Sequence, residues 1–134
     1  MTTLRVGIAS MEQFRAYTMS IVRGEHKRGR SEPKLWFSSI GGFANVLSDR
    51  NRELLRLIAK TKPQSLDELA KTSRLAKATL SRTLRTLERY GLIRFEKGKG
   101  RTLVPRTLYT GVVLDLSLRV PPWAPTSLPA QGKE

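Results

Sequence analysis

Residues 78–101 read ATLSRTLRTLERYGLIRFEKGKGR, and this stretch decides the fold. Leu80, Leu84 and Leu87 fall within about 40° of one another when the residues are placed on an α-helix. Downstream, LIRFE and RTLVPRT alternate apolar and polar residues on either side of the glycine-rich KGKG. The stretch therefore predicts an amphipathic helix over residues 77–90, followed by a two-stranded hairpin.

The end of this helix and the two helices before it have recognisable sequence signals. Gly91 stands where a left-handed C-terminal cap is wanted. Ser48 is expected to cap a helix whose apolar positions face one side. Ser65 and Glu68 form a capping-box pattern at the start of LDELAKT, and SRLA is a tight connection to the next helix. Three helices and a hairpin in this order predict a winged helix-turn-helix.

The side of the 77–90 helix opposite the leucines is either small or basic. An α-helix fits the major groove of B-DNA, and an arginine can fork onto guanine or phosphate oxygens. The cations Lys97, Lys99 and Arg101 alternate with glycines at the expected hairpin tip, a mobile loop suited to flanking phosphates. The residues predicted to contact DNA are Lys77, Ala78, Thr79, Ser81, Arg82, Arg85, Arg89, Lys97, Lys99 and Arg101.

The net charge of the chain is +14, and most of the excess lies in one region. Residues 48–106 carry 16 basic and 6 acidic side chains, whereas residues 1–47 carry 7 and 3, and residues 107–134 carry 2 and 2. A local field of this sign attracts polyanions. If the helix is considered alone, its basic side could equally be the solvent-exposed face of an ordinary helical bundle. The hairpin cations, on an adjacent element and of the same sign, favour DNA.

The stretch SLDELAKTSRLAKATLSRTLRTLERYGLIRFEKGKGR resembles the winged helix-turn-helix domains of small prokaryotic regulators of the MarR/ArsR type. The matched core covers residues 50–106, through Leu69-Ala70, Thr79-Leu80-Ser81-Arg82, Leu84, Leu87 and Gly91-Leu92-Ile93. The resemblance implies an α+β DNA-binding fold and leaves the recognised sequence open. One departure is Ala76, where the pattern usually has a serine N-cap, and losing that cap costs about 1 kcal/mol of helix stability.

The flanking segments resemble a narrower family, small DNA-binding antitoxins encoded beside a toxin in prokaryotic operons. The pattern is an N-terminal strand and helix, LWFSS before the helices, and GVVLDL after the hairpin. This resemblance implies a cytoplasmic homodimer that represses its own operon and neutralises a toxin. An antitoxin acting mainly on its toxin and a stand-alone transcription factor remain alternatives.

The N-terminal part, residues 1–47, is expected to hold a strand, a helix over residues 11–25 and a second strand. Ser10 and Gln13 form a capping-box pattern at the start of this helix. Because the three helices of the winged domain are complete without this helix, we expect it either to pack on its own domain or to pair with a second chain. The apolar face that would make either contact consists of Met11, Phe14, Tyr17, Ile21 and Val22.

C-terminal to the winged domain, residues 107–118 are expected to form a half-buried strand with Val112, Leu114, Leu116 and Leu118 on its covered face. Residues 119–134 hold four of the seven prolines and are expected to form a flexible tail. Trp123 in this tail is either an anchor for a partner or without a role.

Several classes of function fit the composition poorly. The chain has no cysteine and one histidine, His26 in a charged loop, so we expect no metal site, no cofactor and no catalytic constellation. GKGKGR lacks the strand-to-helix context of a phosphate-binding loop. The N-terminus is too polar for a secretion signal, and no apolar run would span a bilayer. An RNA-binding winged helix remains a rival, since positive charge alone does not distinguish the two nucleic acids.

Overall fold

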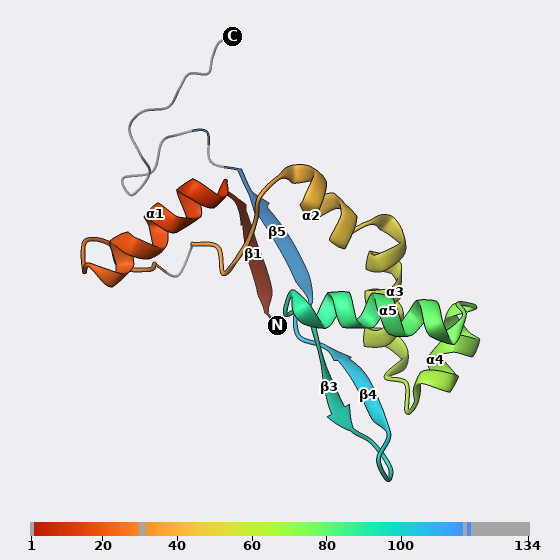
Figure 1. Cartoon of the computed structure of the whole chain (residues 1–134). Helices are drawn as coiled ribbons and strands as arrows, with labels where there is room; N and C mark the ends of the chain where they lie inside the picture. The colour runs from red at the N-terminus through yellow and green to blue at the C-terminus, as the bar shows by residue number, and fades with distance from the viewer. Residues whose placement is uncertain (1, 30–31, 117, 119–134) are drawn as a thin grey trace. The chain divides into compact units, whose positions relative to one another are not determined.

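The computed structural model describes residues 2–29, 32–116 and 118 (Figure 1). The chain is mixed α+β, with the order β1-α1-β2-α2-α3-α4-α5-β3-β4-β5. It divides into two compact units. The first consists of Phe43–Gly111 with the residues before Leu4, and the second of Leu4–Gly42 with the residues after Gly111. The Pro-rich segment predicted at 119–134 lies outside the described residues.

The first unit contains the helices α3 (Asp49–Thr61), α4 (Leu66–Ser73) and α5 (Lys77–Arg89). Two of the predicted caps are present. The Ser48 hydroxyl accepts the backbone N–H of Asn51 (3.2 Å), and the Ser65 hydroxyl accepts that of Glu68 (3.0 Å). Each bond satisfies one of the donors that a helix N-terminus leaves free, so serine fixes where both helices begin.

The C-terminus of α5 confirms the predicted glycine cap. Gly91 has φ = +76°, a left-handed conformation that favours glycine. Its N–H donates to Glu88 O (2.9 Å), and the next N–H, of Leu92, donates to Leu87 O (2.9 Å). This pair of bonds is the Schellman motif, and both leucines are buried, as the motif prefers. The cap turns the chain directly from α5 into the first strand of the hairpin.

The hairpin consists of β3 (Ile93–Lys97) and β4 (Leu103–Thr107), paired antiparallel. Pro105 lies in the middle of β4, opposite Phe95. The N–H of Leu108 donates to Leu92 O, and the N–H of Gly98 donates to Thr102 O, so Leu92–Leu108 and Gly98–Thr102 are hydrogen-bonded pairs. In an antiparallel ladder such pairs alternate with pairs that exchange no backbone hydrogen bond, and the Phe95–Pro105 pair is of the second kind. Proline therefore removes no bond from the two-stranded sheet, which is why an edge strand tolerates it there.

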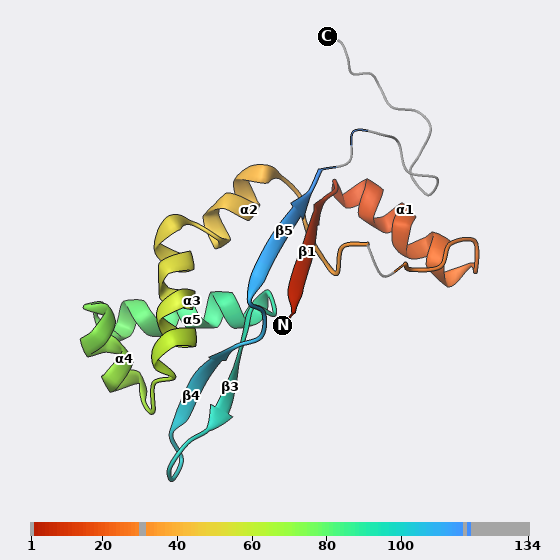
Figure 2. The ribbon, with the colours of Figure 1, turned by 180° about the vertical axis from the view of Figure 1, so that it is seen from behind.

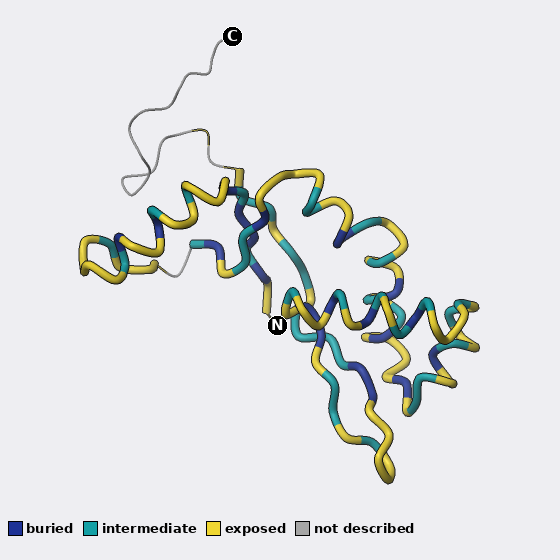
Figure 3. Tube along the Cα trace, viewed as in Figure 1, coloured by how far each residue is buried: buried dark blue, intermediate teal, exposed yellow. Residues whose placement is uncertain are grey.

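The core of the first unit is built from one face of each helix and the hairpin (Figure 3). The side chains of Ile58, Leu69, Leu80, Leu84 and Leu87 have 0% exposure, and they come from α3, α4 and α5. Burying one such side chain stabilises a fold by about 1.5–3 kcal/mol. The leucine spacing predicted from the sequence thus fixes which face of α5 points inward.

The second unit contains a three-stranded sheet in the order β2-β1-β5 and the helix α1 (Met11–Val22). The strands are β1 (Thr3–Ile8), β2 (Leu35–Phe37) and β5 (Gly111–Asp115), and α2 (Ile40–Val46) joins the two units. β1 and β2 run parallel. A Cβ on Gly7 of β1 would lie 2.5 Å from the Trp36 ring, so only glycine fits beneath this indole.

Three predictions about the second unit are wrong in part. The first helix ends at Val22 instead of residue 25, because Gly24 takes φ = +76° and cannot continue the helix. The last strand spans Gly111–Asp115 instead of 107–118, since Thr107 belongs to β4. Leu116 and Leu118, predicted to be covered, are 48% and 98% exposed. Of the apolar face predicted for α1, Tyr17 is buried, whereas Met11, Phe14 and Val22 are exposed. Ser20, which lay outside that predicted face, is buried as well.

Candidate nucleic-acid interface

The outward face of α5 presents three arginines to solvent. Arg82, Arg85 and Arg89 are exposed, and so is Ala78 near the start of the helix. None of the three arginines takes part in the salt bridges found within the described part of the chain. The face lies opposite the buried leucines, as the 3.6-residue period requires. The guanidinium groups are therefore available to a ligand.

The remaining predicted residues of α5 lie at the edges of this face or at its start. Thr79 and Ser81 are half-buried. The Lys77 ammonium lies 2.8 Å from the Asp67 carboxylate. The hydrogen bond from Lys77 and its positive charge lower the pKa of Asp67 from its usual value. Lys77 thus already has an acidic partner within the protein, which sets it apart from the arginines.

The N-terminus of α5 lacks a side-chain cap, as the sequence predicted. Ala76 takes the extended conformation of an N-cap (φ −63°, ψ 143°), but its methyl group accepts no hydrogen bond. The first N–H groups of α5 consequently stay available to an acceptor outside the helix. Such groups carry the positive end of the helix dipole, which favours a phosphate oxygen.

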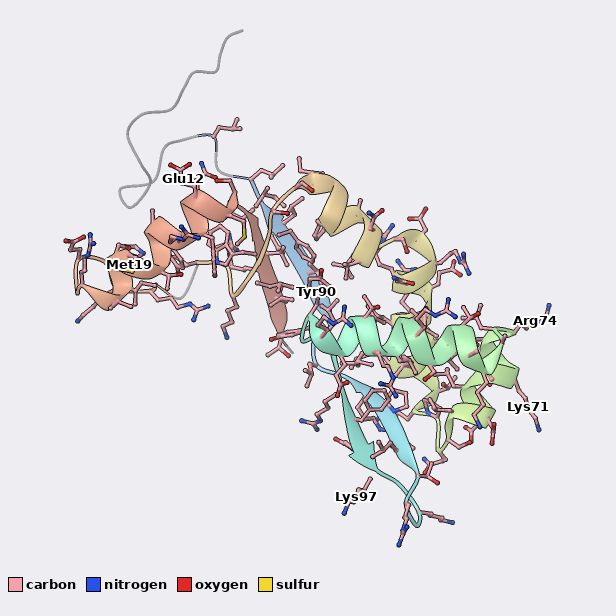
Figure 4. All side chains as sticks on the ribbon, in the orientation of Figure 1. Glu12, Met19, Lys71, Arg74, Tyr90 and Lys97 are labelled. Atoms are coloured by element: carbon pink, nitrogen blue, oxygen red, sulfur yellow. The ribbon has the colours of Figure 1, made fainter. Side chains whose placement is uncertain are left out.

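The hairpin tip carries a second group of cations. Lys97, Lys99 and Arg101 are exposed, and the tip is closed by a bond from Gly98 N–H to Thr102 O (2.7 Å). Figure 4 shows the Lys97 side chain directed away from the ribbon. Gly100 has φ = +67°, a left-handed conformation that glycine adopts readily, and this allows the tight turn at the tip. The tip therefore projects three positive charges beyond the packed part of the first unit.

The base of the hairpin is fastened to the helices by an arginine. Arg106 Nη1 donates to Pro63 O (2.9 Å) and to Pro105 O (2.8 Å), so it links β4 to the α3–α4 connection. Arg94, which belongs to the basic stretch quoted above, is paired instead with Glu96 on the same strand. These two arginines serve the hairpin itself and are not free cations of the candidate interface.

Two cations of this surface were missed by the sequence analysis. Lys71 in the last turn of α4 and Arg74 in the α4–α5 turn are exposed, and Figure 4 shows both at the end of α5 farthest from Tyr90. Arg74 takes φ = +63°, a conformation that glycine usually supplies in such turns. The sequence signal that could have identified Arg74 is a basic residue at a position of a short helix–helix turn where glycine is usual.

The described residues contain no group of three or more His, Cys, Asp or Glu side chains that could hold a metal ion. Within the same residues, no helix has the length and apolar character needed to cross a membrane.

The model of a family described as HVO_A0114 matches residues 46–114. This segment contains α3, α4, α5 and the whole hairpin, and hence every residue of the candidate interface. No curated protein matches the chain, and no solved structure does.

Proposed function

The chain belongs to the HVO_A0114 family, and we propose that it is a sequence-specific, double-stranded DNA-binding transcriptional regulator. In this proposal α3, α4, α5 and the β3–β4 hairpin form a winged helix-turn-helix. α4 and α5 are joined by a three-residue turn at positions 74–76, the spacing of a helix-turn-helix. α5 would be the recognition helix, and the hairpin would be the wing.

The observation that carries the proposal is the unpaired arginine face of α5. Arg82, Arg85 and Arg89 share the side of α5 opposite its buried leucines, and they form no ion pair within the described residues. A helix of this kind is of a size to enter the major groove, which is about 12 Å wide. Ala78 is small and exposed, so the helix could approach base edges closely at its N-terminal end.

The cations divide into two roles in this arrangement. Arg82 is the sixth and Arg85 the ninth of the 13 residues of α5, so both lie in its central part on the outward face, and arginine can bind guanine through two hydrogen bonds. Outside this central part lie Arg89 in the last turn of α5, Lys71 and Arg74 beside the α4–α5 turn, and the cations at the hairpin tip. They would contact phosphates, which fix register and supply affinity without reading sequence.

B-form DNA fits this surface better than duplex RNA does. The major groove of A-form RNA is deep and narrow, so a helix cannot enter it to read base edges. The α5 face would then meet only phosphates and riboses. Selectivity for a DNA sequence is thus the property that separates the proposal from general attraction to polyanions.

The experiment is selection of duplexes from a random DNA library, followed by fluorescence anisotropy with the selected duplex. We expect the protein to bind the selected duplex about 10³-fold or more tighter than a scrambled duplex. Arg82→Ala and Arg85→Ala should each weaken only the specific binding, by about 1–3 kcal/mol. Equal affinity for scrambled DNA, duplex RNA and heparin would contradict the proposal.

A further inference from the structure

A cavity of about 370 Å³ lies between α3 and the C-terminal end of α4. Its walls come from these two helices and from the α4–α5 turn, all of which belong to the first unit. Small-molecule sites in proteins have volumes of about 300–1,000 Å³, so this cavity has room for a ligand at the small end of that range.

Three leucines form the apolar part of the wall. Leu54 and Leu57 come from α3, and Leu75 comes from the α4–α5 turn. Leu54 is buried, whereas the other two are only half-buried although they belong to the packed part of the unit. An apolar group in the cavity would remove the remaining leucine surface from water, which favours binding.

Two opposite charges line the same cavity. Arg50 and Glu53 are three residues apart on α3, and both are exposed. Neither takes part in a salt bridge within the described part of the chain. The hydroxyls of Thr72 and Ser73, by contrast, donate to backbone carbonyls of the preceding turn of α4 (2.9 and 3.5 Å). The guanidinium and the carboxylate are therefore the main polar groups available to a ligand.

We propose that this cavity binds a free amino acid with an apolar side chain. The Arg50 guanidinium binds the carboxylate of the ligand through two parallel hydrogen bonds, and the Glu53 carboxylate binds its ammonium group. The leucines cover the ligand's side chain. An α-amino acid carries both charges on one carbon atom, and side chains three residues apart on a helix are neighbours, so one small molecule reaches both groups.

The pair of charges selects against ligands that carry only one charge. A carboxylic acid without an amino group brings its negative charge towards Glu53, and an amine without a carboxylate brings its positive charge towards Arg50. Both arrangements place like charges close together, which is unfavourable. Glycine has both charges but no group that covers the leucines. The wall therefore favours a molecule that combines two opposite charges with an apolar body.

The cavity is separate from the surface assigned to DNA, but the two share one segment of chain. Lys71 and Arg74 belong to the candidate interface, whereas their neighbours Thr72, Ser73 and Leu75 line the cavity. No residue of the cavity wall is assigned to DNA. The proposal therefore does not rest on the proposed function, and it can be tested on the chain alone.

Amide chemical-shift titration of the ¹⁵N-labelled chain without DNA tests the site, with L-leucine and L-phenylalanine as probes. We expect saturable changes in residues 50–57 and 72–75, with a dissociation constant of about 1 mM or lower for at least one probe. 3-Phenylpropionate, phenethylamine and glycine each lack one of the three recognised groups and should bind about tenfold or more weakly. The proposal is wrong if any of these three compounds binds as tightly as the better probe, or if neither probe changes these residues at about 10 mM.

Substitutions on α3 test whether the two charges hold the ligand. Arg50→Gln and Glu53→Gln each remove one charge and should each weaken binding of the better probe about tenfold or more. Both positions are exposed, so the fold should be kept. Arg56→Gln is the matched control, because it removes the same charge from an exposed position of the same helix outside the cavity. Unaltered affinity in either cavity variant, or an equal loss in the control, would overturn the proposal.

Discussion

Removing two cations from the hairpin tip should make DNA binding less dependent on salt. Lys97 and Lys99 are exposed and form no salt bridge in the described part of the chain. The change Lys97→Ala with Lys99→Ala therefore tests electrostatics without disturbing the fold. Each phosphate neutralised by a cation releases counterions, and each lost contact reduces that release.

The size of the effect follows from the number of cations on the surface. The proposal assigns six cations to phosphates: Lys71, Arg74, Arg89, Lys97, Lys99 and Arg101. Six contacts give a slope of about −5.4 in log K against log salt concentration, and four contacts give about −3.6. Between 50 and 200 mM salt, the wild type should lose affinity about 2,000-fold and the double variant about 150-fold.

Fluorescence anisotropy with a labelled duplex at several salt concentrations measures this slope. The matched control is Arg56→Ala with Lys60→Ala, which removes the same charge from the exposed side of α3. α5 passes in front of α3 in Figure 1 and behind it in Figure 2, so the two helices cover opposite sides of the first unit. An unchanged slope in the hairpin variant, or an equal change in the control, would refute the reasoning.

Three further predictions concern stability and its coupling to the interface. Leu84→Ala empties a fully buried site and should lower the free energy of unfolding by about 2–5 kcal/mol in urea denaturation, whereas Arg89→Ala on the outward side should change it by less than about 0.5 kcal/mol. Arg74→Gly removes the strain of a left-handed arginine, so it should raise the free energy of unfolding by about 1 kcal/mol while it weakens DNA binding. If the change lowered both the free energy of unfolding and the affinity for DNA, Arg74 would have a structural role instead. Partial burial raises the pKa of Glu32, but hydrogen bonds from neighbouring side chains and a backbone N–H outweigh this and hold the pKa below its usual 4.5. Its contribution is complete above pH 4.5 and is lost as the pH falls through the lowered value, so Glu32→Gln should flatten the acid limb of a pH–stability curve, and an unaltered limb would exclude this carboxylate as its source.

The first unit was predictable because its signals are local. A serine before a helix, a glycine after it and a leucine every three or four residues each act within one or two turns of chain. The buried leucines and exposed arginines of α5 follow from this period alone. For the same reason the sequence identified the hairpin cations and the missing cap at Ala76.

The errors arose where the outcome depends on tertiary structure. α1 carries apolar residues on two sides, so periodicity cannot tell which side faces the sheet; the contacts of Tyr17 with Glu32 and Trp36 decide it. The left-handed conformation of Arg74 is likewise set by the packing of α4 against α5, since arginine has no preference for it. The link from Arg106 to Pro63 spans 43 residues, and no local pattern encodes such a contact.

The central claim is that the outward face of α5 and the hairpin tip bind duplex DNA. Amide chemical-shift mapping of the ¹⁵N-labelled chain with a selected duplex tests it most directly. The account predicts that the largest changes occur in residues 77–89 and 97–101, and that Arg82→Ala with Arg85→Ala strongly reduces those in residues 77–89 while the dispersion of the free spectrum is kept. Changes concentrated in α1 or on the exposed side of α3, with α5 unaffected, would contradict it.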